Sequence, residues 1–157
     1  MLTEVTSIFG ETYAAPTAPD RRATRRFVDA WTRAARGRYP SWRAMREIDL
    51  GEDWNWAFSV DLQRSSAFPY FIYLGSSLAK LSDIYLPGGS DWMVSLLEKA
   101  TTEIGACVIA ETPIEREDEL ILANGRRLLF RSVTAPLADN GRTISHVAGV
   151  VNGTLGD

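Results

Sequence analysis

The last third of the chain constrains the fold most strongly, because it holds three strand-forming runs joined by tight turns. Asn124-Gly125 separates runs at 119–123 and 126–137, and this dipeptide is the preferred pair for a two-residue type I′ hairpin, since both positions need a positive φ. Asp139-Asn140-Gly141 precedes a third run at 143–152, which is rich in β-branched residues. Three antiparallel strands are predicted here, so the chain must build a sheet.

Two more strands are predicted upstream. Residues 55–62 alternate between apolar and polar side chains, which is typical of a half-buried strand. The run 68–74 is rich in aromatic residues, and Pro69 favours an edge position because proline lacks an amide donor. The face of the first strand that we expect to be buried carries Trp56, Phe58, Val60 and Leu62.

Helical spacing of apolar residues predicts an amphipathic helix over about 21–36, with Asp20 as its N-cap and Gly37 as its stop. A short helix is expected after Ser41, and another over 75–84. Ser90 would then begin a longer helix, whose apolar face includes Met93, Leu96, Leu97, Ala100, Ile104, Cys107 and Val108. Gly105 weakens that helix by about 1 kcal/mol relative to alanine, so its end is expected from there on, and Pro113 marks the end at the latest.

The element order gives the fold class. Two strands, intervening helices and three strands predict an α+β domain: a five-stranded antiparallel sheet with helices on one face and an amphipathic N-terminal helix. The strand 126–137 is apolar on both faces, so a second cover is needed. The stripe on the N-terminal helix is the candidate, either within its own chain or across a homodimer. Its residues Phe27, Val28, Trp31 and Ala35 are the predicted dimer interface.

Charge is unevenly distributed along the 157 residues. Residues 21–46 hold nine arginines and one acid, giving +8, whereas 1–20 carry −3 and 47–157 carry −8. The plainer interpretation is that the basic helix pairs with acids of its own body or of a partner subunit. The alternative is an anionic partner, contacted through Arg21, Arg22, Arg25 and Arg26.

Several classes of protein are excluded or disfavoured. The apolar content of 45% argues against wholesale disorder, and a single cysteine and a single histidine exclude an internal disulfide, a multi-cysteine zinc site and a two-histidine metal site. The N-terminus lacks a secretory signal, and no run approaches the roughly 18 apolar residues of a membrane span. We therefore expect a cytoplasmic protein with no membrane span.

Four segments, in this order, resemble a PAS domain. They are Gly75-Ser76-Ser77-Leu78 with its G-x-x-L pattern, Gly125–Arg131, Ala135–Gly141 with its PL…DG turn, and Val147–Val151. The resemblance covers about residues 22–152 and is closest to stand-alone bacterial PAS-like regulators that carry a tryptophan-containing basic helix. Where the family has a glycine-rich element after the small helices, this chain has 81–87, which alters the expected pocket. The predicted domains are a flexible arm at 1–19, a basic helical segment at 20–47 and a PAS-like core at 48–157.

The resemblance implies a sensory or regulatory module that acts in bacterial signalling through a protein partner, forms a homodimer, and has a small metabolite or nucleotide as a further candidate ligand. A ligand would lie between the sheet and the helices, and its identity and any cofactor are unknown. The candidate lining residues are Tyr73, Ser77, Cys107 and Arg131. The alternative function is nucleotide or nucleic-acid binding by the arginine-rich helix, although we do not expect nucleic acid.

The residues that could carry chemistry are weak candidates for an active site. Cys107 lies on an apolar helix face, where a buried small side chain is the commoner role. The Asn-Cys-Arg motif of photoreactive PAS domains is absent from this sequence. His146 is distant along the chain from any motif serine, and the acidic run 115–119 is interpreted as a solvated loop. We expect a protein that is not an enzyme and has no metal site; a small-molecule enzyme is the third hypothesis.

Overall fold

The structure is a computed structural model that describes residues 4–6, 12–14, 22–36, 38–64, 69–79, 102–121, 125 and 127–156. A five-stranded antiparallel sheet forms its centre, with strand order β4-β3-β7-β6-β5. The strands are β3 (Ala57–Asp61), β4 (Phe71–Leu74), β5 (Ile114–Ile121), β6 (Arg127–Leu137) and β7 (His146–Gly156). A separate antiparallel pair is formed by β1 (Glu4–Thr6) and β2 (Thr12–Ala14).

The longest strand pair organises the sheet. β6 and β7 stay in antiparallel register from Arg127 opposite Gly156 to Leu137 opposite His146. β3 joins the other side of β7, which places β7 at the centre and leaves β4 and β5 at the edges. The edge position that Pro69 predicted for β4 is therefore confirmed.

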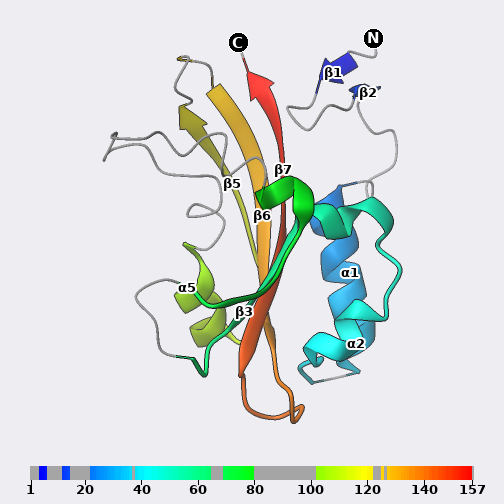
Figure 1. The fold of residues 1–157 in the computed structure, drawn as a ribbon, viewed down its shortest axis with the longest axis vertical. Helices are drawn as coiled ribbons and strands as arrows, with labels where there is room; N and C mark the ends of the chain where they lie inside the picture. The colour runs from blue at the N-terminus through cyan, green and yellow to red at the C-terminus, as the bar shows by residue number, and fades with distance from the viewer. Residues whose placement is uncertain are drawn as a thin grey trace.

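One face of the sheet is covered by the N-terminal helix of the same chain. Figure 1 shows α1 (Ala23–Ala35) and α2 (Trp42–Arg46) on this side of the sheet. Phe27 and Ala30 are fully buried against residues of β6 and β7, including Val133 and Val150. Of the two arrangements that the sequence left open, cover within one chain is the one found here.

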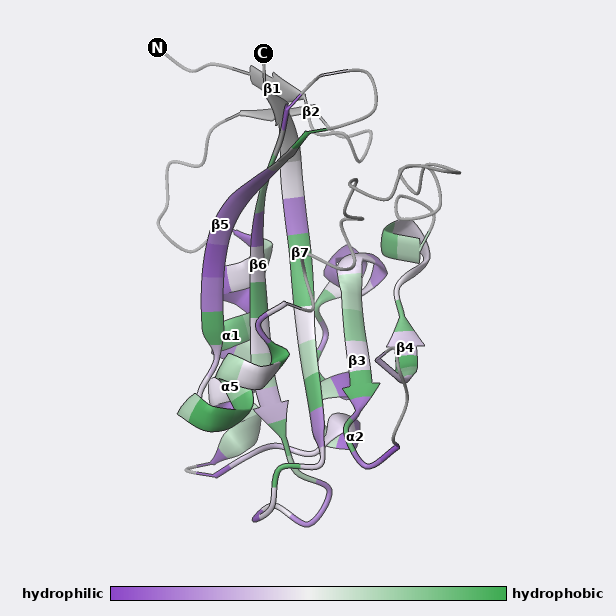
Figure 2. Cartoon of the chain, turned by 90° about the vertical axis from the view of Figure 1, so that its left-hand side faces the viewer, coloured by the Kyte–Doolittle hydropathy of each residue, from purple (hydrophilic) through white to green (hydrophobic). Residues whose placement is uncertain are grey.

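The opposite face has its own apolar layer. Phe58 and Val60 of β3 are buried there with Cys107 of α5 (Ile104–Ala110) and with Leu78, which lies in a helical turn at 76–79. Figure 2 shows α5 in front of the sheet on this side, beside a predominantly hydrophilic β5. Trp56 and Leu62 pack against the same cluster, so the predicted face of β3 is buried. Ala57 and Ser59 on the other face are buried as well, because α1 covers that side of the sheet, so the strand is not half-buried.

These elements give the chain a PAS-like fold. Two strands are followed by helices and then by three strands, and all five strands join one antiparallel sheet, as the resemblance implied. The short helix after Ser41 is also confirmed, because the Ser41 hydroxyl accepts a hydrogen bond of 3.0 Å from the amide of Ala44.

Element ends differ from the sequence-based expectation. α1 begins at Ala23, so its N-cap position is Arg22, and the left-handed residue after its end is Arg36 (φ 46°). Asp20 and Gly37, which were predicted for these roles, lie outside the described residues. α5 begins at Ile104 after a turn at residues 102–103, so the predicted long helix is interrupted there. It ends at Ala110, beyond Gly105 and before Pro113; the Ser90 start lies outside the described residues.

The acidic run 115–119 is the main correction, because it belongs to strand β5 and to no loop. β5 pairs with β6 along its whole length, from Ile114 opposite Thr134 to Ile121 opposite Arg127. Strand propensity depends on neighbours, and arginines of β6 and α1 face these acids. In the two predicted turns, Gly125 and Gly141 have positive φ values of 82° and 75°.

Replacing Gly149 with alanine should lower the free energy of unfolding by about 2–3 kcal/mol. A Cβ on Gly149 would collide with the Val133 carbonyl oxygen and lie 2.7 Å from Cζ of Phe58. Gly105→Ala is the matched control, because a Cβ there meets open space in a helix and should stabilise by up to about 1 kcal/mol. Urea denaturation of both variants checks the opposite signs; two equal effects would contradict the β7 packing.

Phe27→Ala should cost about 3–5 kcal/mol of stability, because the ring is completely buried under α1 and its removal leaves a cavity. Ile109→Ala removes an apolar side chain that is 85% exposed, and should change stability by less than about 0.5 kcal/mol. Thermal and urea unfolding measure both. A Phe27 variant as stable as the Ile109 variant would show that α1 does not cover the sheet.

Candidate functional site

Acidic side chains of β5 form a row that faces α1. Because alternate residues of a strand share one face, Glu115, Glu117 and Glu119 lie on the same side. Glu115 is 3.5 Å from Arg25 of α1, and Glu119 is 2.8 Å from Arg127 of β6. The ion pairs therefore run along β5, and they join its acids to arginines of α1 and β6 in the same chain.

Glu117 occupies the middle of this row and contacts two arginines. Nε of Arg131 lies 2.5 Å from its carboxylate, and Arg22 lies 3.9 Å away. The hydrogen bond and charge of Arg131, with a smaller contribution from Arg22, lower the pKa of Glu117.

The row borders an open groove of about 420 Å³ at the beginning of α1. Both signs of charge and some apolar surface face it. Its lining residues are Arg22, Ala23, Thr24, Glu117, Asp118, Glu119, Leu129, Phe130, Arg131, Asn152 and Gly153. Because the arginines here already contact carboxylates, the groove has no surplus positive charge to hold an anion.

The predicted anion contacts are accordingly engaged within the chain. Arg26 donates two hydrogen bonds to Asp53, at 2.6 and 2.9 Å, and this carboxylate is largely buried. Arg22 and Arg25 pair with β5 as described. Arg21 lies outside the described residues. The plainer interpretation of the basic helix, pairing with acids of its own body, is the arrangement found.

The four predicted ligand-lining residues do not surround one cavity. Cys107 lies in the apolar layer under α5, and Ser77 lies in the helical turn after β4. Arg131 points to the α1 side, where it meets Glu117, and Tyr73 packs on tryptophans of that same side. Tyr73 and Arg131 thus face away from Cys107, because strand parity, which the sequence alone left open, decides the face.

Tyr73 belongs to an aromatic cluster that holds an arginine. Its hydroxyl donates a 2.8 Å hydrogen bond to the carbonyl of Trp54, and its ring lies 5.5 Å from that of Trp42. The guanidinium of Arg46 stacks over these rings, 4.6 Å from the centroid of Tyr73 and 4.8 Å from that of Trp54. The planar group that stacks on Trp42 and Trp54 is therefore the guanidinium of Arg46, a side chain of the same chain.

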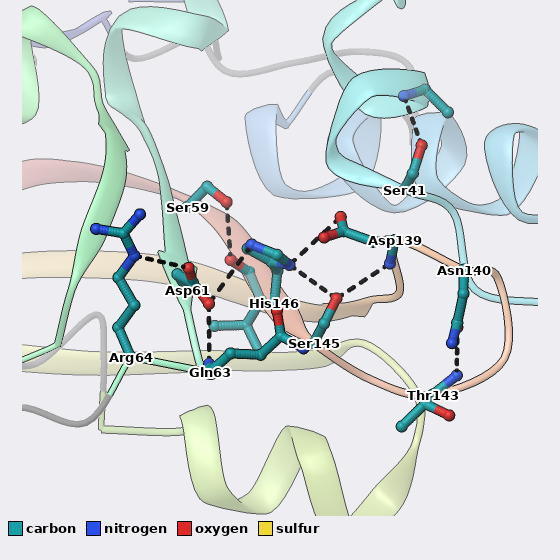
Figure 3. A network of polar contacts seen from close by, with 12 residues as sticks. Ser41, Ser59, Asp61, Gln63, Arg64, Asp139, Asn140, Thr143, Ser145 and His146 are labelled. Atoms are coloured by element: carbon teal, nitrogen blue, oxygen red, sulfur yellow. Dashed lines mark hydrogen bonds and ion pairs between the residues drawn. The ribbon is translucent and has the colours of Figure 1, made fainter.

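His146 lies at the end of β7 in a polar network (Figure 3). Its Nδ1 is 2.8 Å from the hydroxyl of Ser145 and 3.5 Å from the carboxylate of Asp139, and its Nε2 is 3.7 Å from Asp61. Serine, histidine and aspartate thus meet here. The sequence did not predict this, because His146 is distant along the chain from any motif serine. The adjacency of Ser145 and His146 was the available signal.

This network is built for structure. Ser145 and His146 are each only 6% exposed, and the Ser145 hydroxyl also accepts a 3.0 Å hydrogen bond from the amide of Asp139. The buried hydroxyl therefore has a partner within the chain on both sides. The contacts instead fasten the β6–β7 loop to Asp61 at the end of β3, as Figure 3 shows.

The remaining reactive group among the described residues is the free thiol of Cys107. Cys107 is fully buried, and burial raises its pKa from 9.0 to about 12. Among the residues that the structure describes, no cluster of histidine, cysteine and acidic side chains could hold a metal ion. Within the same residues, no helix is long and apolar enough to cross a bilayer.

Comparison with known proteins gives distant structural neighbours. No family model and no curated protein matches the chain. The light-state blue-light photoreceptor Aureochrome1 LOV is 13% identical, covering 62% of this chain and 80% of its own, with a TM-score of 0.43. The LOV domain from the Erythrobacter litoralis EL346 blue-light activated histidine kinase is 11% identical (62% and 93%, TM-score 0.41). A fungal LOV domain photoreceptor is 17% identical (67% and 79%, TM-score 0.40).

Cys107 should react with iodoacetamide about a thousandfold more slowly in the native protein than in urea at pH 8, because the raised pKa suppresses the thiolate. Since the pKa is raised on folding, the thiol contributes stability that is present below pH 9 and is lost as the pH rises towards 12. Mass spectrometry of the alkylated protein checks the rate. Equal rates in the two solvents would place Cys107 at the surface.

Proposed function

We propose that this PAS-like domain is a sensory or regulatory module that acts by binding another protein. The observation that carries the proposal is the way in which α1 is attached to the sheet. Trp31 donates a 2.8 Å hydrogen bond from Nε1 to the carbonyl of Pro136, and Arg26 is held by Asp53. A change in the sheet would be transmitted to α1 through these contacts, which lie far apart in the sequence.

The fold supports a binding role over a catalytic one. Cys107 and His146, the side chains best suited to covalent or acid–base chemistry, are buried and contribute to packing and to the β6–β7 loop. We therefore propose that the chain is not an enzyme. We also propose that it works in the cytoplasm, as expected from the sequence. A small ligand between the sheet and α5 is also part of the proposal.

Homodimer formation stays part of the proposal, with a changed contact. Phe27 and Ala35 are buried within one chain, whereas Val28 and Trp31 are only partly buried. A dimer would therefore use the remaining surface of α1 or another exposed face. Sedimentation velocity of the native chain tests this: one species of two-chain mass supports a dimer, and a single-chain mass at high concentration rejects it.

Reconstitution tests the proposed function. The full chain would be cross-linked in cells, the captured protein purified, and its binding to the purified chain measured by calorimetry. Binding at about micromolar affinity or tighter, with a change in the partner's own activity, is the expected result. Capture that is not reproduced between purified components would overturn the proposal.

Native mass spectrometry with an absorption spectrum tests the ligand. If the domain senses a small molecule, the native protein should carry extra mass that is lost on denaturation. A protein that binds its partner and carries no extra mass would be an interaction module only.

A further inference from the structure

The arginines of the described residues divide into two groups. Most of them lie within 4.0 Å of a carboxylate, and Arg46 stacks on aromatic rings. Apart from Arg46, those with no carboxylate within that distance, among the residues described, are Arg33, Arg36, Arg38 and Arg142. Among the described residues, the surplus positive charge of the basic segment therefore lies after the middle of α1, whereas Arg22, Arg25 and Arg26 at its beginning are paired with acids.

Arg38 and Arg142 line the same groove although 104 positions separate them. This groove measures about 690 Å³ and lies between the end of α1, the end of α5 and the β6–β7 loop. In Figure 1 the β6–β7 loop lies at the end of the molecule opposite to the C-terminus. The lining residues are Trp31, Thr32, Ala35, Arg38, Tyr39, Ala110, Glu111, Gly141 and Arg142.

Among the described residues that line this groove, Glu111 is the single acid, and it lies beside Tyr39. Burial together with the charge of Glu111 raises the pKa of Tyr39. Both arginine side chains are exposed. Proximity to the helix end favours a cation at Arg33 in the last turn of α1, but it does not explain Arg142, which comes from a loop.

Apolar surface adjoins the positive charge. Ala35 and Ala110 line the groove, and Ile109, the neighbour of Ala110, is 85% exposed. A surface that combines arginine with exposed aliphatic side chains matches a segment of alternating acidic and apolar character.

We propose that this groove docks an acidic segment of the partner protein, whose carboxylates pair with Arg38 and Arg142 and whose apolar side chains contact Ile109. The inference rests on the proposed protein-binding function and deepens it. Residues 47–157 carry a net charge of −8, so a long nucleic acid would meet repulsion beyond the groove, whereas a short acidic segment would not.

The test uses the full chain and a fluorescein-labelled peptide of glutamates and leucines in helical spacing, followed by fluorescence anisotropy at low salt. Arg38→Gln/Arg142→Gln should weaken binding by about tenfold. Arg43→Gln/Arg64→Gln is the matched control: it removes the same charge from exposed sites outside the groove and should change the affinity by less than about twofold. Arg38→Lys/Arg142→Lys should restore most of the binding.

Three outcomes would overturn the inference. They are an absence of binding to the wild type at low salt, equal losses in the groove and control variants, and tighter binding of a labelled single-stranded DNA that the groove variant abolishes. Circular dichroism confirms that each variant is folded. If a reconstituted partner binds Arg38→Gln/Arg142→Gln as tightly as the wild type, the groove is wrong and the protein-binding function stands. If no partner is reconstituted while the peptide result holds, the function fails and the surface chemistry stands.

Discussion

A sheet that is apolar on both faces must be covered on both faces, and the rest of this structure depends on that requirement. β7 lies at its centre with Val147 and Val151 turned to one layer and Ala148 and Val150 turned to the other. Burying apolar surface contributes about 25 cal/mol per Å², so neither layer can be left to solvent. α5 and the helical turn at 76–79 cover one face. α1 covers the other face, which attaches the basic segment to the core.

The cover brings charge as well as apolar surface. α1 carries its apolar stripe towards β6 and β7, so its arginines necessarily flank the stripe and reach β5 and η1 (Gly51–Trp56). The acids at alternate positions of β5 pair with arginines of α1 and β6. The same acids protect an edge strand, because charged side chains disfavour pairing with another chain. One row of ion pairs thus joins helix to sheet and blunts the sheet edge.

The ion pairs also decide where the molecule can meet a partner. Exposed pairs of this kind contribute only about 0–1 kcal/mol each to stability, so their larger consequence is neutralisation of the beginning of α1. Among the described residues, Arg33, Arg36 and Arg38 have no carboxylate within 4.0 Å, and a loop brings Arg142 to the groove that Arg38 and Glu111 line. Positive charge is thereby concentrated in the groove that Arg38 and Arg142 line.

The sequence by itself determined the element types, the PAS-like order and the buried face of β3, because these depend on local periodicity, turn residues and capping. It left the partner of the apolar stripe open, and it misassigned the acids of β5, since an acidic strand forms only when a neighbouring strand and helix supply arginines. Only the tertiary structure decided which arginines are matched, that Tyr73 and Arg131 face away from Cys107, and that Ser145, His146 and Asp61 meet. Those outcomes depend on strand parity and on contacts between residues far apart in the chain, which no local pattern encodes.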